Sequence, residues 1–297
     1  MRDYPVEIDG LKLQVREYPG AGETIIFLHY GGGNLVMWQG VAPFFERAYR
    51  LVMPDLRGHG RSDKPPSGYH IDDMAGDIYG LMARLGIERA HVVGSSLGAE
   101  VGLSLAANHP ESVVSLVCEG ALYCEFGPYG IQDDTLVAVE SVGRRLAKMR
   151  AEPESRYETP EALVQASRQS YEAVGWWNAA VEAVEAYDVC PAEDSGYTNS
   201  WRKWARDTYM QNYYTTRFEQ YYRRLCCPVL MLPGERELQN ERMRRAMQGL
   251  SQLPPQCQIV NIPGAVHAYG WLLDPQGYSQ AVIGFLNKVS EALPSCA

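Results

Sequence analysis

Short apolar runs recur along the chain, separated by turn residues or by longer segments with helical periodicity. Eight of these runs have the length and the bounding residues of β-strands. They cover residues 6–8, 11–15, 25–28, 51–53, 91–93, 113–117, 229–232 and 259–262. From residue 25 onward they alternate with helical patterns at 38–48, 71–85, 97–108, 241–250 and 276–289. The alternation predicts an α/β fold, with a mostly parallel eight-stranded sheet and helices on both faces.

One long stretch, residues 120–227, interrupts this alternation because it contains no convincing strand pattern. Ordinary connections in α/β units take only a few residues, so we expect an insertion here. Its helical patterns lie at 136–149, 160–171, 177–187 and 201–222, and Pro191 and Gly196 break them. The sequence therefore predicts a core formed by residues 1–122 and 226–297 and a helical, aromatic-rich cap formed by residues 123–225.

The composition narrows the classes of partner. The net charge is −9 over 297 residues and no basic run is present, which argues against nucleic acid. No apolar run approaches the roughly 20 residues of a membrane helix, and the first residues lack the apolar core of a signal peptide. The seven cysteines lack metal-type spacing, so we expect reduced thiols, no bound metal and a cytoplasmic location. We expect a monomer or homodimer that acts on a small molecule.

Ser96 is the strongest candidate for a nucleophile. It is the central residue of Gly94-Ser95-Ser96-Leu97-Gly98, which follows a strand pattern and precedes a helix pattern. A sharp turn between a strand and a helix holds a serine in a strained conformation, and the flanking glycines let neighbouring backbone pass closely. The hydroxyl then projects at the carboxyl edge of the sheet.

A serine hydroxyl needs a base, and His267 is the candidate. It lies in the loop after the last predicted strand, at the same edge of the sheet. The carboxylate that orients this histidine has two candidates. Glu237 follows the strand pattern at 229–232, and Glu119 follows the one at 113–117. We favour Glu237 as the acid and keep Glu119 as the alternative.

The glycine loop after His29 is the candidate oxyanion hole. Three glycines allow backbone N–H groups to approach a substrate oxygen closely. We expect the amide of Gly31, or that of Gly32 if the turn differs, to act with the amide of Leu97. Leu97 begins the helix after Ser96, where the helix dipole also favours negative charge.

In their order along the chain these motifs resemble the α/β-hydrolase superfamily, specifically its capped serine esterase-like branch. The resemblance rests on His29 with its glycines, the segment 55–65, the turn at Ser96, residues 234–237 and His267. It implies the α/β-hydrolase fold with a cap, and it implies that segment 55–65 is a structural loop, so that His59 is not the base. This chain departs from the family where Tyr30 replaces the usual glycine and where Glu237 replaces the usual aspartate. Some relatives, including certain haloalkane dehalogenases, carry a glutamate at the position of Glu119.

The predicted activity is hydrolysis of a carboxylic ester or lactone of a small, largely apolar molecule through an acyl-enzyme on Ser96, without a cofactor. Alternatives are a carbon–carbon bond hydrolase, which often has a tryptophan where Ala268 stands, a cofactor-free perhydrolase or haloperoxidase, and a slow-turnover ligand receptor. An aspartate nucleophile, typical of dehalogenases and epoxide hydrolases of this fold, is absent from the turn at Ser96. The residues expected to contact the substrate are Tyr30, Ser95, Trp177, Trp204 and Tyr214.

Overall fold

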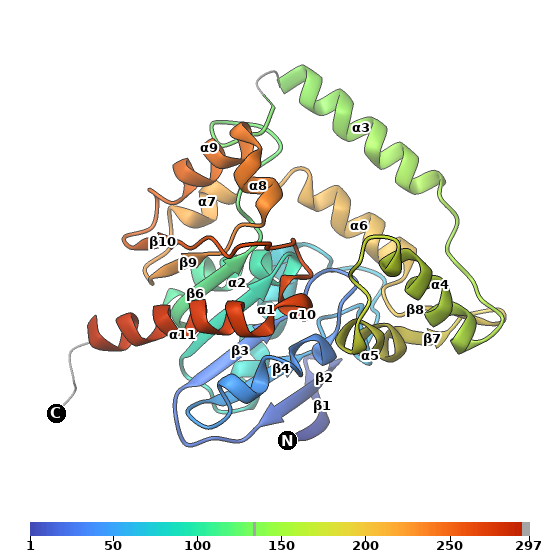
Figure 1. Cartoon of the computed structure of the whole chain (residues 1–297), viewed down its shortest axis with the longest axis horizontal. Helices are drawn as coiled ribbons and strands as arrows, with labels where there is room; N and C mark the ends of the chain where they lie inside the picture. The colour runs from blue at the N-terminus through green and yellow to red at the C-terminus, as the bar shows by residue number, and fades with distance from the viewer. Residues whose placement is uncertain (133–134, 293–297) are drawn as a thin grey trace.

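The computed structural model describes residues 1–132 and 135–292, and within them eight strands form one sheet (Figure 1). Every one of these strands overlaps or borders a predicted run. They are β1 (Arg2–Ile8), β2 (Leu11–Tyr18), β3 (Thr24–Leu28), β4 (Arg50–Pro54), β5 (Ala90–Ser95), β6 (Val113–Glu119), β9 (Val229–Met231) and β10 (Cys257–Ile259). The last strand ends at Ile259, where the predicted one begins, so its expected position is corrected toward the N-terminus.

The strand order is β1-β2-β4-β3-β5-β6-β9-β10. β1 and β2 pair antiparallel, and so do β2 and β4, whereas the strands from β4 to β10 pair in parallel. The carboxyl ends of β3, β5, β6 and β9 therefore meet at one edge of the sheet. Ligands of open α/β sheets bind outside this edge, so the topology places the candidate site there.

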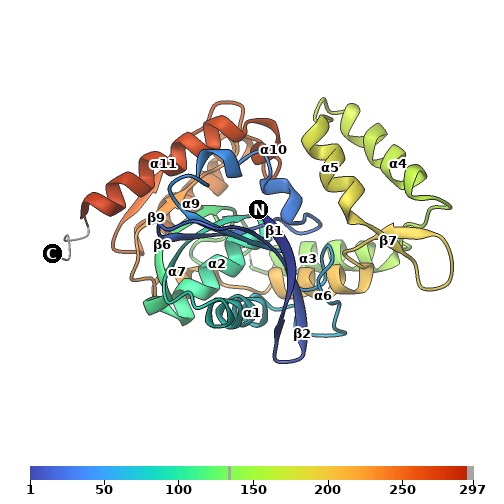
Figure 2. The ribbon, with the colours of Figure 1, turned by 90° about the horizontal axis from the view of Figure 1, so that it is seen from below.

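Helices cover both faces of the sheet (Figure 2). One face packs against α1 (Ile71–Arg84), α2 (Leu97–Asn108), α7 (Phe218–Tyr222) and α9 (Glu241–Leu250), and the other packs against α10 (Gly270–Leu273) and α11 (Pro275–Ala292). Alternate residues of β3 enter different apolar clusters: Ile26 and Leu28 join the first, and Ile25 and Phe27 the second. A strand buried on both sides has this continuous apolar pattern. The predicted α/β class and sheet are confirmed.

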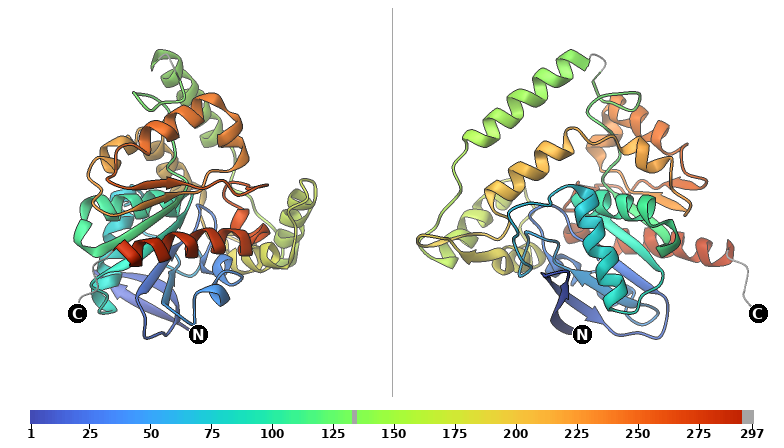
Figure 3. Two further views of the ribbon diagram at one scale, coloured as in Figure 1. Left: turned by 60° about the vertical axis from the view of Figure 1, so that its left-hand side comes forward. Right: turned by 180° about the vertical axis from the view of Figure 1, so that it is seen from behind.

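A long insertion separates β6 from β9 (Figure 3, right). It contains α3 (Thr135–Ala151), α4 (Pro160–Glu172), α5 (Ala179–Asp188) and α6 (Lys203–Tyr213), with α7 at its end. Two short strands, β7 (Val189–Pro191) and β8 (Tyr197–Asn199), pair antiparallel between α5 and α6. The expectation that no strand lies here was therefore wrong, and the predicted helix 201–222 is interrupted between α6 and α7.

A second helical expectation also needs correction. The segment 38–48 forms no α-helix, because the chain there makes two short 3₁₀ turns at Leu35–Trp38 and Ala42–Phe44. Gly40 and Pro43 lie in or between these turns, and both residues disfavour a continuous helix. Two short elements remain: a 3₁₀ turn at Pro110–Ser112 before β6, and the helix α8 (Glu235–Gln239) after β9. Among the described residues no helix has the length and apolarity required to cross a membrane.

Candidate active site

Ser96 forms the sharp turn between β5 and α2. Its φ of 49° and ψ of −115° lie outside the regions that non-glycine residues usually occupy. The turn needs close backbone packing, because a Cβ at Gly98 would lie 2.1 Å from the carbonyl oxygen of Leu28. The amide of Ser96 also donates a hydrogen bond of 2.5 Å to the carbonyl oxygen of Glu119, which ties the turn to β6.

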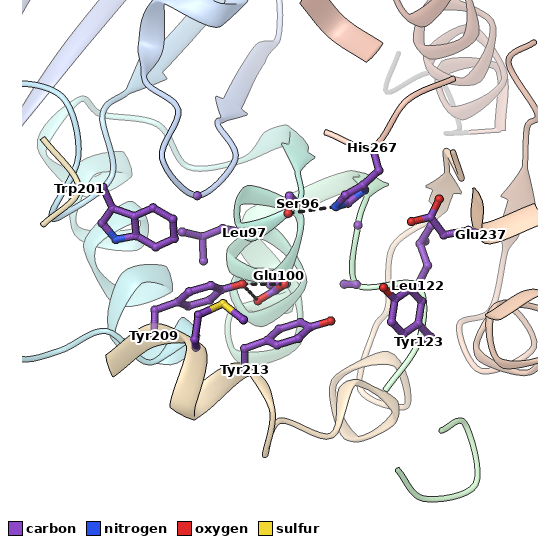
Figure 4. A pocket seen from close by; sticks show the side chains of 14 residues that line it. Ser96, Leu97, Glu100, Leu122, Tyr123, Trp201, Tyr209, Tyr213, Glu237 and His267 are labelled. Atoms are coloured by element: carbon purple, nitrogen blue, oxygen red, sulfur yellow. Dashed lines mark hydrogen bonds between the residues drawn. The ribbon is translucent and has the colours of Figure 1, made fainter. Parts of the chain in front are cut away.

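The structure brings Ser96, His267 and Glu119 together from distant parts of the chain. Nε2 of His267 lies 3.2 Å from the Ser96 Oγ, a contact drawn in Figure 4. Nδ1 of the same ring lies 3.0 Å from Oε1 of Glu119, within ion-pair distance. This order of hydroxyl, imidazole and carboxylate is the arrangement by which a base activates a serine.

The preference for Glu237 as the partner of His267 is corrected by this geometry. Glu119 is fully buried at the end of β6, the strand beside β5, whereas Glu237 extends from α8 after the more distant strand β9. Glu237 is 4% exposed and lines the cavity beside the site. Its Oε2 has no hydrogen-bond partner among the described residues.

Ser95 has a different place from the expected one. It is fully buried, and its hydroxyl donates a hydrogen bond of 2.5 Å to Oε2 of Glu119. Ser95 is not among the residues that line the cavity, so its assignment as a substrate contact is corrected. Its side chain instead holds the carboxylate that faces His267.

The surrounding carboxylates control the charge of His267. Burial lowers the pKa of this imidazole, but Glu119, with smaller contributions from Glu237 and Glu100, outweighs burial and raises the pKa to about 9. The opposite charge stabilises the imidazolium, the form that His267 takes after accepting a proton from serine.

The candidate oxyanion donors lie at the same place. Gly31 and Leu97 both line the cavity around Ser96, while Gly32 lines a neighbouring cavity instead. This placement favours Gly31 over Gly32. The ring of Trp201 lies directly against the loop, because a Cβ at Gly31 would be 2.5 Å from its Cη2 atom. A residue with a side chain therefore does not fit at position 31 without movement of the indole.

The histidines of the two other motifs are structural. His29 is fully buried, accepts a hydrogen bond of 2.9 Å from the Leu56 amide through Nε2, and faces the Tyr30 carbonyl with Nδ1. Burial lowers the pKa of His29 to about 4, so the ring is neutral. His59 is also buried, and its ring lies between those of His29 and Trp201, with centroids 4.9 Å and 4.6 Å away.

A cavity of about 290 Å³ opens beside Ser96 and His267 (Figure 4). Its walls come from the Ser96 turn, the segment after β6 and helix α6 of the insertion. The side chains that line it include those of Glu100, Tyr123, Trp201, Tyr209, Tyr213 and Glu237. The volume lies at the lower end of the range for small-molecule sites, so a small substrate fits.

Most of the predicted substrate contacts lie elsewhere. Tyr30 lines the neighbouring cavity, on the other side of the Gly31 loop. Trp177 stacks with Tyr171, Trp204 packs edge-on against Tyr69, and Tyr214 lies beneath Arg145. None of these residues lines the cavity at Ser96, so the assignments of Tyr30, Trp177, Trp204 and Tyr214 as contacts there are corrected. An aromatic pattern on a helix shows that a face is apolar, but it does not show which ring reaches the site.

Sequence reasoning missed Glu100. It lies one helical turn after Ser96 in α2, is 3% exposed, and accepts hydrogen bonds of 3.0 Å and 2.9 Å from the Tyr209 hydroxyl. Burial raises the pKa of Glu100 to about 8. The available signal was a single acidic residue in an otherwise small and apolar helix, four positions after the nucleophile candidate and hence on the same face.

Comparison with known proteins agrees with this fold. Residues 23–267 match the model of the α/β hydrolase fold family, and the chain belongs to this family. The chain is 30% identical to the 2-(acetamidomethylene)succinate hydrolase of Mesorhizobium japonicum, across 95% of this chain and 94% of that protein. The crystal structure of an E-2-(acetamidomethylene)succinate hydrolase superposes with a TM-score of 0.78 at 27% identity, over 96% of this chain and 99% of that one.

A shorter match reaches a relative of different chemistry. The fluoroacetate dehalogenase of a Burkholderia species is 42% identical over 102 residues, which span 33% of this chain and only 34% of that protein. These names describe different substrates and different bonds. The comparisons therefore establish the hydrolase family but do not identify the substrate, which has to be inferred from the residues of the site.

Proposed function

We propose that this protein is a serine hydrolase that cleaves a carboxylic ester or a lactone of a small molecule through an acyl-enzyme on Ser96. The observation that carries the proposal is the continuous contact from the Ser96 hydroxyl through His267 to Glu119, at the wall of a cavity of about 290 Å³. An aspartate at position 96, in the turn between β5 and α2, would instead indicate the dehalogenase-type mechanism, in which a carboxylate is the nucleophile. This chain has a serine at that position.

In the proposed reaction, Nε2 of His267 accepts the proton of Ser96 as the oxygen attacks the carbonyl carbon. Glu119 stabilises the imidazolium through Nδ1, and the amides of Leu97 and Gly31 face the developing oxyanion. His267 then protonates the leaving alcohol, which departs and leaves the acyl group on Ser96. A water molecule, activated by the same imidazole, releases the acid and restores the serine.

The substrate of the full-length relative is not transferred to this chain. A succinate derivative carries two carboxylates, and such groups need cationic partners in a buried site. Among the described residues that line the cavity there is no lysine or arginine, and Glu100 and Glu237 are present instead. This lining supports a substrate without negative charge.

A fluorophosphonate probe tests the nucleophile, and nitrophenyl esters with lactones of graded length test the reaction. We expect the probe to label the wild-type protein and not Ser96→Ala. Steady turnover of an ester at an ordinary enzymatic rate, above about 1 per second, would exclude the slow receptor. Labelling that persists in Ser96→Ala would remove the basis of the proposal.

A further inference from the structure

The cavity at Ser96 contains more negative charge than the proposed reaction uses. Glu119 faces His267, and Glu237 and Glu100 also line the cavity. Both contribute to the raised pKa of His267, but among the described residues no hydrogen bond or ion pair joins either of them to the imidazole or to the serine. Both are nearly fully buried, with exposures of 4% and 3%. A buried carboxylate is costly unless it is paired or hydrogen-bonded, so each of them needs an explanation.

The two carboxylates have different surroundings. Both oxygens of Glu100 accept hydrogen bonds from the Tyr209 hydroxyl, and burial raises its pKa to about 8, so Glu100 is mostly neutral at neutral pH. Glu237 has an oxygen, Oε2, that is buried and has no hydrogen-bond partner among the described residues. Of the two carboxylates, Glu237 is therefore the one with a buried oxygen that lacks a hydrogen-bond partner among the described residues.

The rest of the wall suits a positively charged group. The rings of Tyr123, Trp201, Tyr209 and Tyr213 line the same cavity, and Figure 4 shows Tyr123 beside Glu237 with the other rings across from it. The faces of such rings attract ammonium groups. The described lining contains no lysine or arginine, and its one cationic side chain, His267, is paired through Nδ1 with Glu119.

We infer that the cavity binds a substrate bearing a positively charged, alkylated nitrogen, with Glu237 as the counter-ion and the tyrosine rings as its walls. The inference deepens the proposed ester or lactone hydrolysis, on which it rests for the identity of the reacting bond. The carbon skeleton around the nitrogen meets the apolar faces of the rings, and the charge meets the unpartnered carboxylate oxygen. The protein's net charge of −9 also attracts cations to it from solution.

Binding of choline and of its carbon isostere, 3,3-dimethylbutan-1-ol, isolates the effect of the charge. The two molecules have the same shape, and only choline carries the cationic nitrogen. By calorimetry on the wild-type protein, we expect choline to bind about tenfold or more tightly than the alcohol, as cation–π contacts and a desolvated counter-ion provide. Equal binding, tighter binding of the alcohol, or no binding of choline would overturn the inference. This comparison requires no variant.

Glu237→Gln then assigns the preference to one residue. The substitution keeps the size of the side chain and removes its charge, so the ratio of choline to isostere affinity is expected to fall to near one. Glu235→Gln is the matched control, because it removes a charge from the same short helix at an exposed position outside the cavity, and the ratio is expected to persist. Retention of the full preference in a folded Glu237→Gln protein would show that Glu237 is not the counter-ion.

The acetate esters of choline and of 3,3-dimethylbutan-1-ol provide a test that separates this inference from the proposed function. We expect acetylcholine to be cleaved with a kcat/KM about tenfold above that of 3,3-dimethylbutyl acetate. If neutral esters are cleaved through Ser96 while choline shows no preference in binding, only the cation site is wrong. If choline is preferred in binding while no ester or lactone is cleaved, the cation site stands and the proposed reaction is wrong.

Discussion

Ser95 and Glu119 face each other across the parallel strands β5 and β6, and the Ser95 hydroxyl donates a hydrogen bond of 2.5 Å to Oε2 of Glu119. The other carboxylate oxygen lies 3.0 Å from Nδ1 of His267. The two adjacent serines of this turn therefore contact different groups. Ser96 lies against Nε2 of His267, and Ser95 donates a hydrogen bond to the carboxylate that faces Nδ1 of the same ring. A pair fixed by strand register gives the carboxylate a defined orientation.

Removing the charge of Glu119 is expected to reduce catalysis strongly. In Glu119→Gln the amide no longer stabilises the imidazolium and no longer fixes its tautomer, so kcat should fall by about 10²–10⁴-fold. The measurement is steady-state hydrolysis of a neutral nitrophenyl ester. A larger fall in Glu237→Gln than in Glu119→Gln would contradict the assignment of the acid.

Loss of the Ser95 hydroxyl is expected to have a smaller effect than loss of the Ser96 hydroxyl. Ser95→Ala leaves one oxygen of a fully buried carboxylate without its donor, which costs about 1–3 kcal/mol. We expect kcat to fall by about 10- to 100-fold in Ser95→Ala and to be abolished in Ser96→Ala. Ser95→Thr retains a hydroxyl and should recover part of the activity, whereas equal losses in all three variants would argue against separate roles.

The rate should depend on pH through His267. Its pKa is raised to about 9, and only the neutral imidazole accepts a proton from Ser96. We therefore expect kcat/KM to rise with pH, close to tenfold per unit, and to level off near pH 9. Removing Glu119 removes the main group that raises the pKa, so the plateau in Glu119→Gln should begin at lower pH. A profile that is flat between pH 6 and pH 9 would contradict this.

The raised pKa of His267 also links the stability of the protein to pH. The folded pKa of about 9 lies above the ordinary value of 6.5, so the protonated His267 stabilises the folded state. This contribution is fully present below about pH 6.5 and is lost as the pH rises through about 9. The unfolding midpoints of wild type and His267→Gln, measured across this window, should converge at the alkaline end, and a constant difference would count against the ion pair.

Gly31 and Trp201 should be energetically coupled. A methyl group at position 31 would lie 2.5 Å from the Trp201 ring, so Gly31→Ala should destabilise the protein by about 1–3 kcal/mol through overpacking. In a Trp201→Ala background the same substitution should cost less, because the obstructing ring is absent. Urea unfolding of the four proteins of this double-mutant cycle measures the coupling, and additive effects would show that the two sites do not interact.

Local signals in the sequence are sufficient to predict a feature that depends on a single helix or strand and the turn beside it. The helices at Leu97–Asn108 and Glu241–Leu250 have the predicted bounds, since the glycine-flanked serine turn fixes the start of one and the Asn240 side chain caps the other. Ser96 and His267 can be found from the sequence because each follows a strand at the carboxyl edge of a parallel sheet. The structure of segment 35–44 cannot be predicted in this way, because apolar periodicity does not distinguish short 3₁₀ turns from a helix.

The acid and the cavity wall depend on spatial neighbours, which the sequence does not specify. Glu119 and Glu237 both follow strands that end at the same edge, but β6 is the neighbour of β5 and β9 is one strand further away. This order places Glu119 beside the Ser96 turn, where Nδ1 of His267 lies 3.0 Å from its Oε1. The choice among cap aromatics fails for a related reason, because Trp201, Tyr209 and Tyr213 reach the cavity through the way the segment after β8 and helix α6 pack on the core.

Trapping the acyl-enzyme shows whether Ser96 is the nucleophile. Wild-type protein is mixed with a nitrophenyl acetate, quenched in acid within the first turnovers, digested and analysed by mass spectrometry. We expect one acetyl group on the peptide that contains Ser96, absent in Ser96→Ala and longer-lived in Glu119→Gln. Ester cleavage without acylation of Ser96, or an equal acetyl adduct in Ser96→Ala, would contradict nucleophilic catalysis by this residue.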